Sequence, residues 1–363
     1  MRTNDSGGSD RRAAYLVLAC AVLARIAIGA VAPLTPYDTY YWEWSRRIAA
    51  GYLDHPPAIA LLVRAGTWLF GATTIGVRAG SLLASAAASL VIVRLSGSLG
   101  GGRAMLRAAW IIACMPLAQV GLALATPDAP LLLCWAIALA ALVPALRAGT
   151  DRARTIAWAI AGASLGATMS SKYTAFLLLA SVGVALVAHP RLRASLATRG
   201  PYVALAAAII VLAPNLRWNA SHGWVSFAYQ LSHGLAVHRG SALTHEAELL
   251  GGQLALVSPL LLAALGIATW RALRQRDDDV RVLFAIVAGV TWLVFAASAL
   301  RSAADQNWQG PAYLSAIVLA ASYDGGDRWR RLLRAGIVIG GATTLVIYAQ
   351  TLAPFLPIPA SQD

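Results

Sequence analysis

Three aspartates and one lysine are the residues of this sequence whose types and positions could do chemistry. Asp38, Asp54 and Asp128 lie in short polar stretches between long apolar runs, and Lys172 stands in a turn between two such runs. A carboxylate at the edge of a membrane can accept a proton from a hydroxyl group and so act as a general base. Lys172 is the only lysine among 29 basic residues. A single ammonium in apolar surroundings favours a functional role for it.

Each of these residues also has a simpler explanation. The simpler role for Asp38, Asp54 and Asp128 is to cap helix N-termini and do nothing else, an interaction that contributes about 1 kcal/mol. Lys172 could extend its apolar stem toward the outer lipid headgroups. His55, next to Asp54, could be an ordinary packing residue. The sequence leaves these alternatives open.

The composition predicts that these residues belong to an all-α polytopic membrane protein. The 363 residues are 58% hydrophobic and 12% charged, with a mean hydropathy of +0.64. Such values exclude a soluble domain of ordinary composition. Apolar runs of about 20 residues, enough for a helix to cross a bilayer, recur along the chain and predict about eleven transmembrane helices. We place them near 13–32, 75–94, 107–125, 128–146, 155–171, 173–188, 201–214, 248–270, 282–300, 311–322 and 335–352.

These runs leave no room for a separate soluble domain. We expect a disordered cytoplasmic tail over 1–12, one integral-membrane domain over 13–352, and an outer tail over 353–363. The cysteines all fall inside apolar runs and predict no disulfide framework: Cys20, Cys114 and Cys134.

The arginines predict the orientation of the chain. They concentrate in alternate loops, and loops rich in arginine stay on the cytoplasmic side of a membrane. The amino terminus is therefore expected in the cytoplasm. The opposite, outer face then carries the loops 33–74, 215–247 and 301–310 together with the turns that hold Asp128 and Lys172. Any chemistry should be sought on that face.

The first outer loop is expected to form two short helices along the membrane surface. One runs from Asp38 toward Ala50, and the other starts at Pro56 and ends near Gly71, since proline is tolerated in a first helical turn. Tyrosine and tryptophan are frequent in both helices, as is typical of a bilayer interface.

Five stretches of the sequence together resemble a known family of enzymes. The first is "DTYYWEWSRRIAAGYLDHPP", and the others are "TPDAPLLLCWA", "SSKYTAFLLL", "PNLRWNASHGWVSFAYQLSHG" and "NWQGPAY". They resemble bacterial family 39-type glycosyltransferases of the protein O-mannosyltransferase-like group, which includes transferases that act on the lipopolysaccharide core and that add aminoarabinose to lipid A. The resemblance covers nearly the whole chain and implies the GT-C fold.

The resemblance also implies a reaction. Such enzymes move a sugar from a polyprenyl-phosphate donor to a hydroxyl of an envelope acceptor, here lipid A, core glycan or protein, with inversion. Asp38 would be the general base, with Asp54 or Asp128 assisting, and Lys172 would stabilise the departing phosphate. Further donor contacts would come from His55, His233 and Arg239, although the loop that holds the last two could be an ordinary interfacial loop. Asn307 and Trp308 could hold the sugar by a hydrogen bond and by stacking, or could simply anchor the chain at the membrane interface.

Two departures from the family pattern stand out. Thr39 follows Asp38 where the family often has glutamate, which leaves the role of a second carboxylate unfilled or moved. The large carboxyl-terminal outer domain of longer members is also missing.

The remaining expectations concern cofactors, partners and location. No cofactor is expected, and a bound divalent metal is disfavoured because no paired histidine spacing with a helical carboxylate occurs. The partners would be the lipid-linked donor, the envelope acceptor and the bilayer, without nucleic acid, in a bacterial inner membrane. A lipid-linked-glycan transporter or flippase, a polyprenyl-phosphate phosphatase or ligase, and a purely structural protein are the alternatives. A transporter would place its charged residues near the middle of the membrane rather than on one face.

Overall fold

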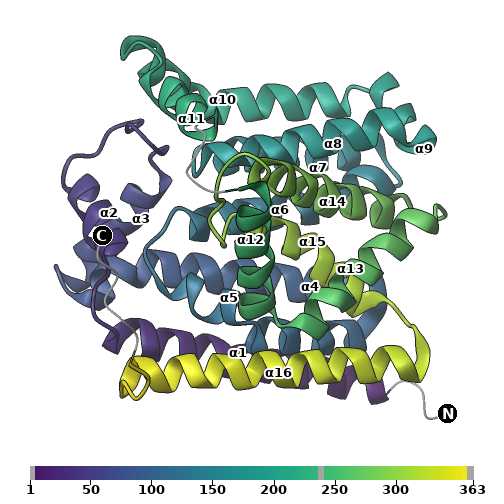
Figure 1. Cartoon of the computed structure of the whole chain (residues 1–363). Helices are drawn as coiled ribbons and strands as arrows, with labels where there is room; N and C mark the ends of the chain where they lie inside the picture. Colours follow the sequence, from purple (N-terminus) through teal and green to yellow (C-terminus); the bar gives the residue numbers. More distant parts are fainter. Residues whose placement is uncertain (1–4, 236–240, 358–363) are drawn as a thin grey trace.

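The computed structural model describes residues 5–235 and 241–357, and helices are the only regular elements within these ranges (Figure 1). The α-helices are α1 (Asp5–Val31), α2 (Pro36–Arg46), α3 (Ala58–Phe70), α4 (Thr74–Cys114), α5 (Pro116–Gln119), α6 (Asp128–Arg147), α7 (Asp151–Met169), α8 (Phe176–Ala188), α9 (Pro190–Arg193), α10 (Gly200–Ser221), α11 (Val225–Leu235), α12 (Ala242–Val257), α13 (Pro259–Arg274), α14 (Asp279–Ala299), α15 (Gly310–Ser322) and α16 (Gly326–Leu352). Short 3₁₀ turns are η1 (Gly121–Ala123), η2 (Tyr173–Ala175) and η3 (Ala194–Ala197). The prediction of an all-α fold is confirmed.

The described helices include six that are long and apolar enough to cross a membrane, or up to eight if each sharply bent pair counts as one span. α3 and α15 are apolar but shorter. The predicted count of about eleven is therefore not confirmed. In Figure 1 most of the long helices run roughly side by side, which gives the molecule two ends.

α4 is two helices that meet at Gly101. Gly101 has φ 70° and ψ −164°, a conformation outside the helical region. A Cβ atom on Gly97 would lie 2.5 Å from Cγ of Met105, eight residues further on. Eight residues of straight helix span about 12 Å, so the chain must reverse between them. The predicted spans 75–94 and 107–125 thus fall on two arms, although the second arm ends at Cys114.

The predicted span 248–270 is wrong as a single helix. α12 and α13 meet at Ser258 with a bend of 99°. Ser258 has φ 79°, and its side chain accepts a hydrogen bond from the amide of Leu261 to cap α13. Pro259, which cannot donate an amide hydrogen bond, begins the new helix. α12 consequently runs across the other helices (Figure 1).

The first outer loop folds as the two predicted short helices, α2 and α3. α3 ends at Gly71, as expected, and Gly71 has φ 72°. α2 ends at Arg46, several residues before the predicted end near Ala50.

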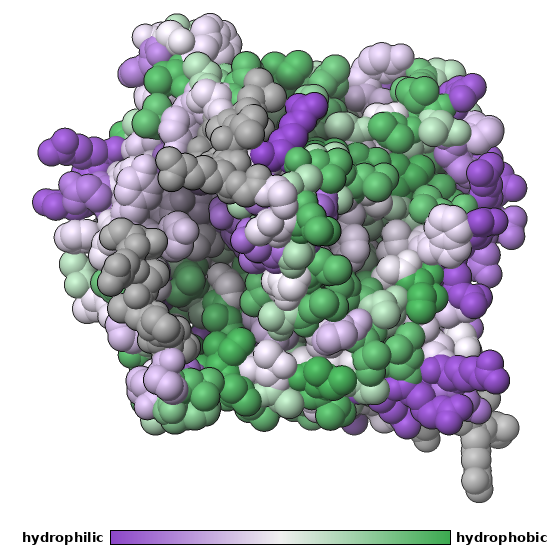
Figure 2. Space-filling view, in the orientation of Figure 1, coloured by the Kyte–Doolittle hydropathy of each residue, from purple (hydrophilic) through white to green (hydrophobic). Residues whose placement is uncertain are grey.

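The loops that the sequence predicts to be cytoplasmic meet at one end of the molecule. Arg147 pairs with Asp278 at 2.6 Å, and Arg107 donates to the carbonyl of Tyr323 at 2.9 Å. Hydrophilic residues line the right-hand edge of Figure 2, and hydrophobic residues cover much of the face between the two ends. The predicted outer turns with Asp128 and Lys172 meet elsewhere, at the cavity described below.

Helices α7 and α10 pack backbone against backbone. A Cβ atom on Gly162 would lie 2.0 Å from the carbonyl oxygen of Ala204, and one on Gly166 would lie 2.4 Å from that of Ala208. Only glycine permits this approach. Since α7 leads directly into the turn of Lys172, the packing fixes the position of that turn.

Candidate active site

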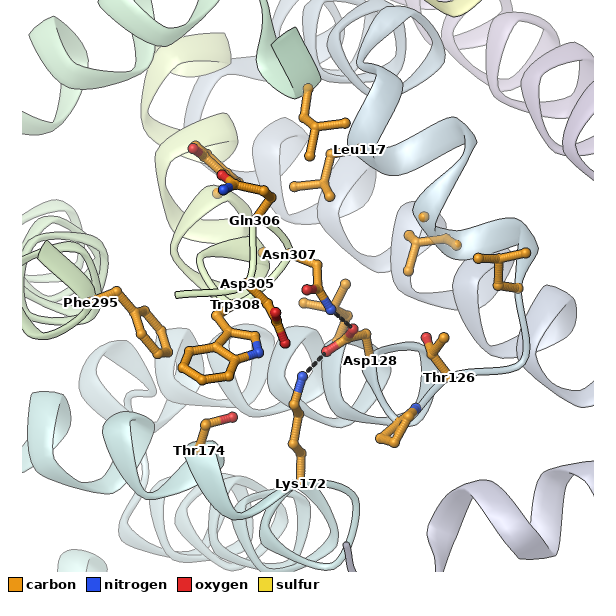
Figure 3. A pocket seen from close by; sticks show the side chains of 18 of the residues that line it. Leu117, Thr126, Asp128, Lys172, Thr174, Phe295, Asp305, Gln306, Asn307 and Trp308 are labelled. Atoms are coloured by element: carbon orange, nitrogen blue, oxygen red, sulfur yellow. Dashed lines mark hydrogen bonds and ion pairs between the residues drawn. The ribbon is translucent and has the colours of Figure 1, made fainter. Parts of the chain in front are cut away.

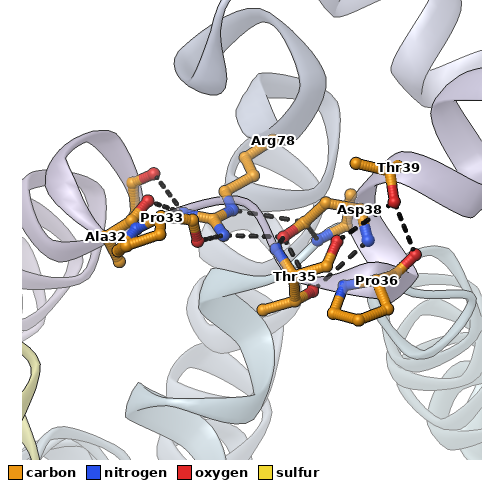
Figure 4. Close-up of polar contacts among 9 residues, drawn as sticks. Ala32, Pro33, Thr35, Pro36, Asp38, Thr39 and Arg78 are labelled. Carbon is orange, nitrogen blue, oxygen red and sulfur yellow. Dashed lines mark hydrogen bonds and ion pairs between the residues drawn. The ribbon is translucent and has the colours of Figure 1, made fainter.

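Asp38 lies at the start of α2 in a dense network of hydrogen-bond donors. Thr35 is the N-cap of α2, and its amide and hydroxyl both donate to Oδ2 of Asp38 at 2.8 Å. The amide of Ala125 donates to Oδ1 at 2.8 Å. Arg78 of α4 completes the network as a two-pronged ion pair, with Nη2 2.6 Å from Oδ2 and Nε 3.2 Å from Oδ1 (Figure 4).

This geometry does not bring Asp38, the predicted general base, to the cavity described below. Both Asp38 and Arg78 are completely buried, and Asp38 is not among the residues that line the cavity. Burial alone would raise the pKa of Asp38, but the hydrogen bonds from Arg78, Thr35 and Ala125 and the charge of Arg78 hold it below its ordinary value. A carboxylate with its oxygens occupied and a lowered pKa is a weak proton acceptor. Asp38 instead joins α2 to α4.

Arg78 is a site residue that the sequence analysis did not consider. It also donates to the carbonyls of Gly29, in the last turn of α1, and of Ala32 and Pro33, just after that helix. The sequence could have pointed to Arg78, because a charged residue inside an apolar run is stable only when it is paired with another polar group.

The candidate site is a cavity of about 740 Å³ beside Asp54, Asp128 and Lys172. Polar side chains of its lining come from separate parts of the chain, around Asp54, Asp128, Lys172, Gln230 and Asn307, and Figure 3 shows those around Asp128, Lys172 and Asn307. The rest of the wall is largely apolar, with side chains from the α4–α6 segment, α8, α14 and α15 such as Leu117, Leu122, Leu177, Phe295 and Ile317. The cavity can therefore hold a molecule with one polar and one apolar part.

Lys172 and Asp128 form an ion pair at the polar wall. Nζ of Lys172 lies 2.9 Å from Oδ1 of Asp128, and both residues are buried. Asn307 donates from its side-chain amide to the other oxygen of Asp128 (Figure 3). This pairing excludes the simpler explanations for both charged residues, because Lys172 does not extend to the surface and α6 has no side-chain cap.

Asp54 and His55 reach the same cavity from the loop between α2 and α3. The hydroxyl of Tyr40 lies 3.2 Å from each carboxylate oxygen of Asp54, and Gln230 of α11 donates to the backbone carbonyl of Asp54 at 2.6 Å. Burial raises the pKa of Asp54 above its ordinary value. Asp54 caps no helix, since the N-cap of α3 is Pro57 and makes no side-chain hydrogen bond.

His55 is kept neutral by its surroundings. Burial, followed by the charge of Lys172, lowers its pKa to about 3. Its Nδ1 atom is buried and has no hydrogen-bond partner in the structure. His55 therefore offers a neutral ring nitrogen to the cavity rather than a positive charge.

Of the other residues predicted to contact the donor or the sugar, two line the cavity and two are not described by the structure. Asn307 and Trp308 both line the cavity. His233 falls in α11, but its side chain is not described, and Arg239 lies outside the described residues. Among the described residues there is no group of three or more histidine, cysteine, aspartate or glutamate side chains that could hold a metal.

Asp305 is a further lining residue that the sequence analysis missed, and it stands two residues before Asn307. The sequence shows an aspartate at this position, but the direction of its side chain depends on the turn between α14 and α15. Tyr41 and Gln230 also line the cavity and were missed, because the directions of their side chains depend on how α2 and α11 are placed in the fold.

The helical arrangement and this cavity define the class of protein, which has the GT-C fold of membrane glycosyltransferases. Residues 54–218 match the family described as dolichyl-phosphate-mannose-protein mannosyltransferase. ArnT from Cupriavidus metallidurans bound to undecaprenyl phosphate superposes with a TM-score of 0.73 at 17% identity, over 94% of this chain and 66% of that one. The oligosaccharyltransferase AglB from Archaeoglobus fulgidus superposes with a TM-score of 0.60 at 14% identity, over 96% and 56%.

Two curated proteins are similar in sequence. The chain is 27% identical over 321 residues to the lipid A galacturonosyltransferase RgtD of Rhizobium johnstonii, over 87% of this chain and 66% of that protein. It is 27% identical over 278 residues to the undecaprenyl phosphate-alpha-4-amino-4-deoxy-L-arabinose arabinosyl transferase 1 of Sodalis glossinidius, over 69% and 49%. The chain thus spans only 66% and 49% of the lengths of these relatives. The resemblance stated from the sequence is confirmed.

Proposed function

We propose that this protein transfers a sugar from a polyprenyl-phosphate donor to a hydroxyl of an envelope glycolipid, with inversion at the anomeric carbon. The observation that carries the proposal is the division of one cavity into a polar wall with Lys172 and Asp54 and a largely apolar remainder. A polyprenyl chain matches the apolar part, and the sugar phosphate matches the polar wall. The names of the similar proteins, which are lipid A and undecaprenyl-phosphate sugar transferases, agree with this assignment.

Lys172 is the cation proposed for the donor phosphate. When the anomeric carbon–oxygen bond breaks, its electron pair stays on the phosphate, and a fixed positive charge nearby stabilises that growing negative charge. Within the described lining of the cavity Lys172 is the only lysine or arginine. Binding of the phosphate would replace Asp128 as its partner.

Asp54 is the base proposed in place of Asp38. The acceptor hydroxyl gives its proton to the carboxylate of Asp54 while its oxygen bonds to the anomeric carbon. A pKa raised above its ordinary value improves a carboxylate as a proton acceptor near neutral pH. Tyr40 and Gln230 hold Asp54 and its loop in place.

We further propose that the cavity faces the outer side of a bacterial inner membrane. The arginine-rich loops meet at one end of the molecule and would lie in the cytoplasm under the positive-inside rule. The active site would then be reached by a lipid donor from within the bilayer and by an acceptor at its surface.

The test is a transfer assay in vesicles that contain the purified protein, a polyprenyl-phosphate sugar and lipid A or core glycolipid, with products identified by mass spectrometry. Glycosylated acceptor is expected from the wild type, and Asp54→Asn should lower kcat by roughly 10²–10⁴-fold. Glu43→Gln is the matched control, because Glu43 is exposed on α2 and pairs only with Arg46. Sugar released into water without glycosylated acceptor would indicate a phosphatase, and donor that changes leaflet unaltered would indicate a flippase.

The sugar itself is not decided by the comparisons. The two similar proteins carry names that specify a galacturonosyl group, which bears a carboxylate, and an amino-deoxy-arabinose, which bears an amine. Both relatives are 27% identical to this chain. Which of these two kinds of sugar the protein transfers must therefore be inferred from the residues of the cavity.

A further inference from the structure

The charged side chains of the described cavity are unbalanced. Three carboxylates line it, those of Asp54, Asp128 and Asp305, against one ammonium, that of Lys172. No arginine is among the lining residues in the part of the chain that the structure describes. His55 adds no positive charge near neutral pH, because burial lowers its pKa to about 3.

The imbalance grows when a donor binds. Nζ of Lys172 lies 2.9 Å from Oδ1 of Asp128 and neutralises this carboxylate. A donor phosphate that pairs with Lys172 takes that ammonium away from Asp128. The sugar, which is attached to the phosphate, then lies among carboxylates that no other lysine or arginine of the described cavity lining balances.

Asp305 is the carboxylate most available to a sugar. Unlike Asp128, it has no ion pair and no side-chain hydrogen bond with any described residue, and it is exposed. It precedes Asn307 and Trp308 in the turn before α15, and Figure 3 shows its carboxylate directed toward the side of the cavity that holds Lys172 and Asp128. A carboxylate so placed attracts a cation and repels an anion.

Aromatic side chains that line the same cavity are an independent observation that points to a cation. Tyr37, Tyr41, Tyr229 and Trp308 all line the cavity. The face of an aromatic ring carries partial negative charge and attracts an ammonium group. A sugar carboxylate would gain nothing from these faces.

We infer that the sugar transferred by this protein carries an ammonium group, that Asp305 binds this group, and that the site excludes uronic acids. The inference rests on the proposed function and names the substrate class of the same cavity. Asp305 is a specificity residue here, distinct from the proposed base Asp54.

The experiment uses three polyprenyl-phosphate donors that share one sugar ring and differ in a single substituent: an amine, a hydroxyl or a carboxylate. Full-length protein in vesicles is assayed with each, and kcat/KM is measured. The wild type should favour the amine over the hydroxyl by roughly tenfold or more, and should transfer the carboxylate donor least. The preference should shrink as salt concentration rises.

Variants of Asp305 separate this role from a structural one. Asp305→Asn should lower the amine-to-hydroxyl ratio of kcat/KM by roughly tenfold, and Asp305→Lys should reverse the order so that the carboxylate donor exceeds the amine donor. These ratios compare donors on one variant, so they do not depend on how much protein folds. Glu43→Gln, whose carboxylate lies outside the cavity lining, should leave both ratios unchanged.

Equal use of the three donors by the wild type, or a preference for the carboxylate donor, overturns the inference and leaves the proposed function standing. An equal loss of all three activities in Asp305→Asn overturns the assignment of Asp305. Absence of transfer from every donor overturns the proposed function and the inference with it.

Discussion

Replacing Asp38 by asparagine should lower the stability of the protein without removing its base. The change keeps the shape of the side chain and removes its charge. Arg78 would then be fully buried beside a neutral amide, while it still donates to the carbonyls of Gly29, Ala32 and Pro33. The NH₂ group of the asparagine would also face N–H or O–H groups from which Asp38 now accepts hydrogen bonds.

The size of the effect follows from the burial of the pair. Both side chains are 0% exposed. Removing one partner of a buried ion pair costs about 3–5 kcal/mol, because it leaves an uncompensated charge. For a chain of this size such a loss lowers Tm by roughly 4–7 °C. Glu43→Gln on the same helix, which breaks a pair about half exposed on both sides, should cost about 1 kcal/mol or less.

The pH dependence of this stability has a definite sign. The folded pKa of Asp38 lies below the ordinary value of 3.8. Its contribution is therefore complete above pH 3.8 and is lost as the pH falls through the lower folded pKa. Asp38→Asn should lack this acidic loss, in addition to being less stable at neutral pH.

Thermal unfolding in detergent and transfer per folded molecule together test this reasoning. We expect a lowered Tm for Asp38→Asn and a kcat, per folded molecule, within about tenfold of the wild type, since loss of a general base costs 10²–10⁴-fold. Asp54→Asn should give the opposite result, with Tm nearly unchanged and kcat strongly reduced. An unaltered Tm with a kcat lowered more than about 100-fold in Asp38→Asn would restore Asp38 as the base and refute our interpretation of the ion pair.

Four other measurements follow from the structure. Lys172→Ala should lower kcat/KM by roughly 10²–10³-fold and weaken binding of a polyprenyl-phosphate analogue. Lys172→Arg should recover part of the activity and part of the binding. Equal affinity of the wild type and both variants for the analogue would remove the cation from the mechanism. The unfolded chain protonates His55 below pH 6.5, whereas the folded chain does so only near pH 3. Tm should therefore fall as the pH is lowered from 6.5 toward 3, and it should fall less in His55→Gln. Equal slopes of Tm against pH for the two proteins would refute the buried neutral ring. Gly162→Leu should lower the unfolding free energy by about 1–3 kcal/mol or more, whereas Gly183→Leu, which meets open space, should not; equal Tm values would contradict the close packing of α7 and α10. A reporter fused after Arg154 should be cytoplasmic and one fused within 225–240 should be outside, and reversal of either would place the cavity on the other face.

The sequence predicted those features that depend on composition and local spacing. Apolar runs predicted the helices, and Pro57 and Gly71 marked α3 closely. Lys172, Asp128, Asn307 and Asp54 were predicted to be functional and do line one cavity. Their selection succeeded because polar residues in an apolar chain are few.

The contacts between distant residues could not be predicted. The sequence shows Arg78 as a charge inside an apolar run, but nothing in it indicates that its partner is Asp38, 40 residues earlier in the chain. The pairing of Lys172 with Asp128 depends on how α6 and α7 lie against each other. The bend at Ser258 arises from a positive φ at a serine, which local preference does not favour.

The network around Asp38 also imposes an order on biosynthesis. Asp38 receives donors from Thr35 as soon as α2 forms, from Arg78 only after the first arm of α4 enters the membrane, and from Ala125 only after the second arm has followed. Until Ala125 has followed, Asp38 lacks one of its final hydrogen-bond donors, although all the partners of Arg78 precede it in the chain. The first three membrane-embedded segments should therefore reach the native state together, as one cooperative unit that is complete only once residue 125 has left the ribosome. A chain interrupted before that point could form the ion pair of Asp38 with Arg78 but would lack the hydrogen bond from Ala125 that completes the network.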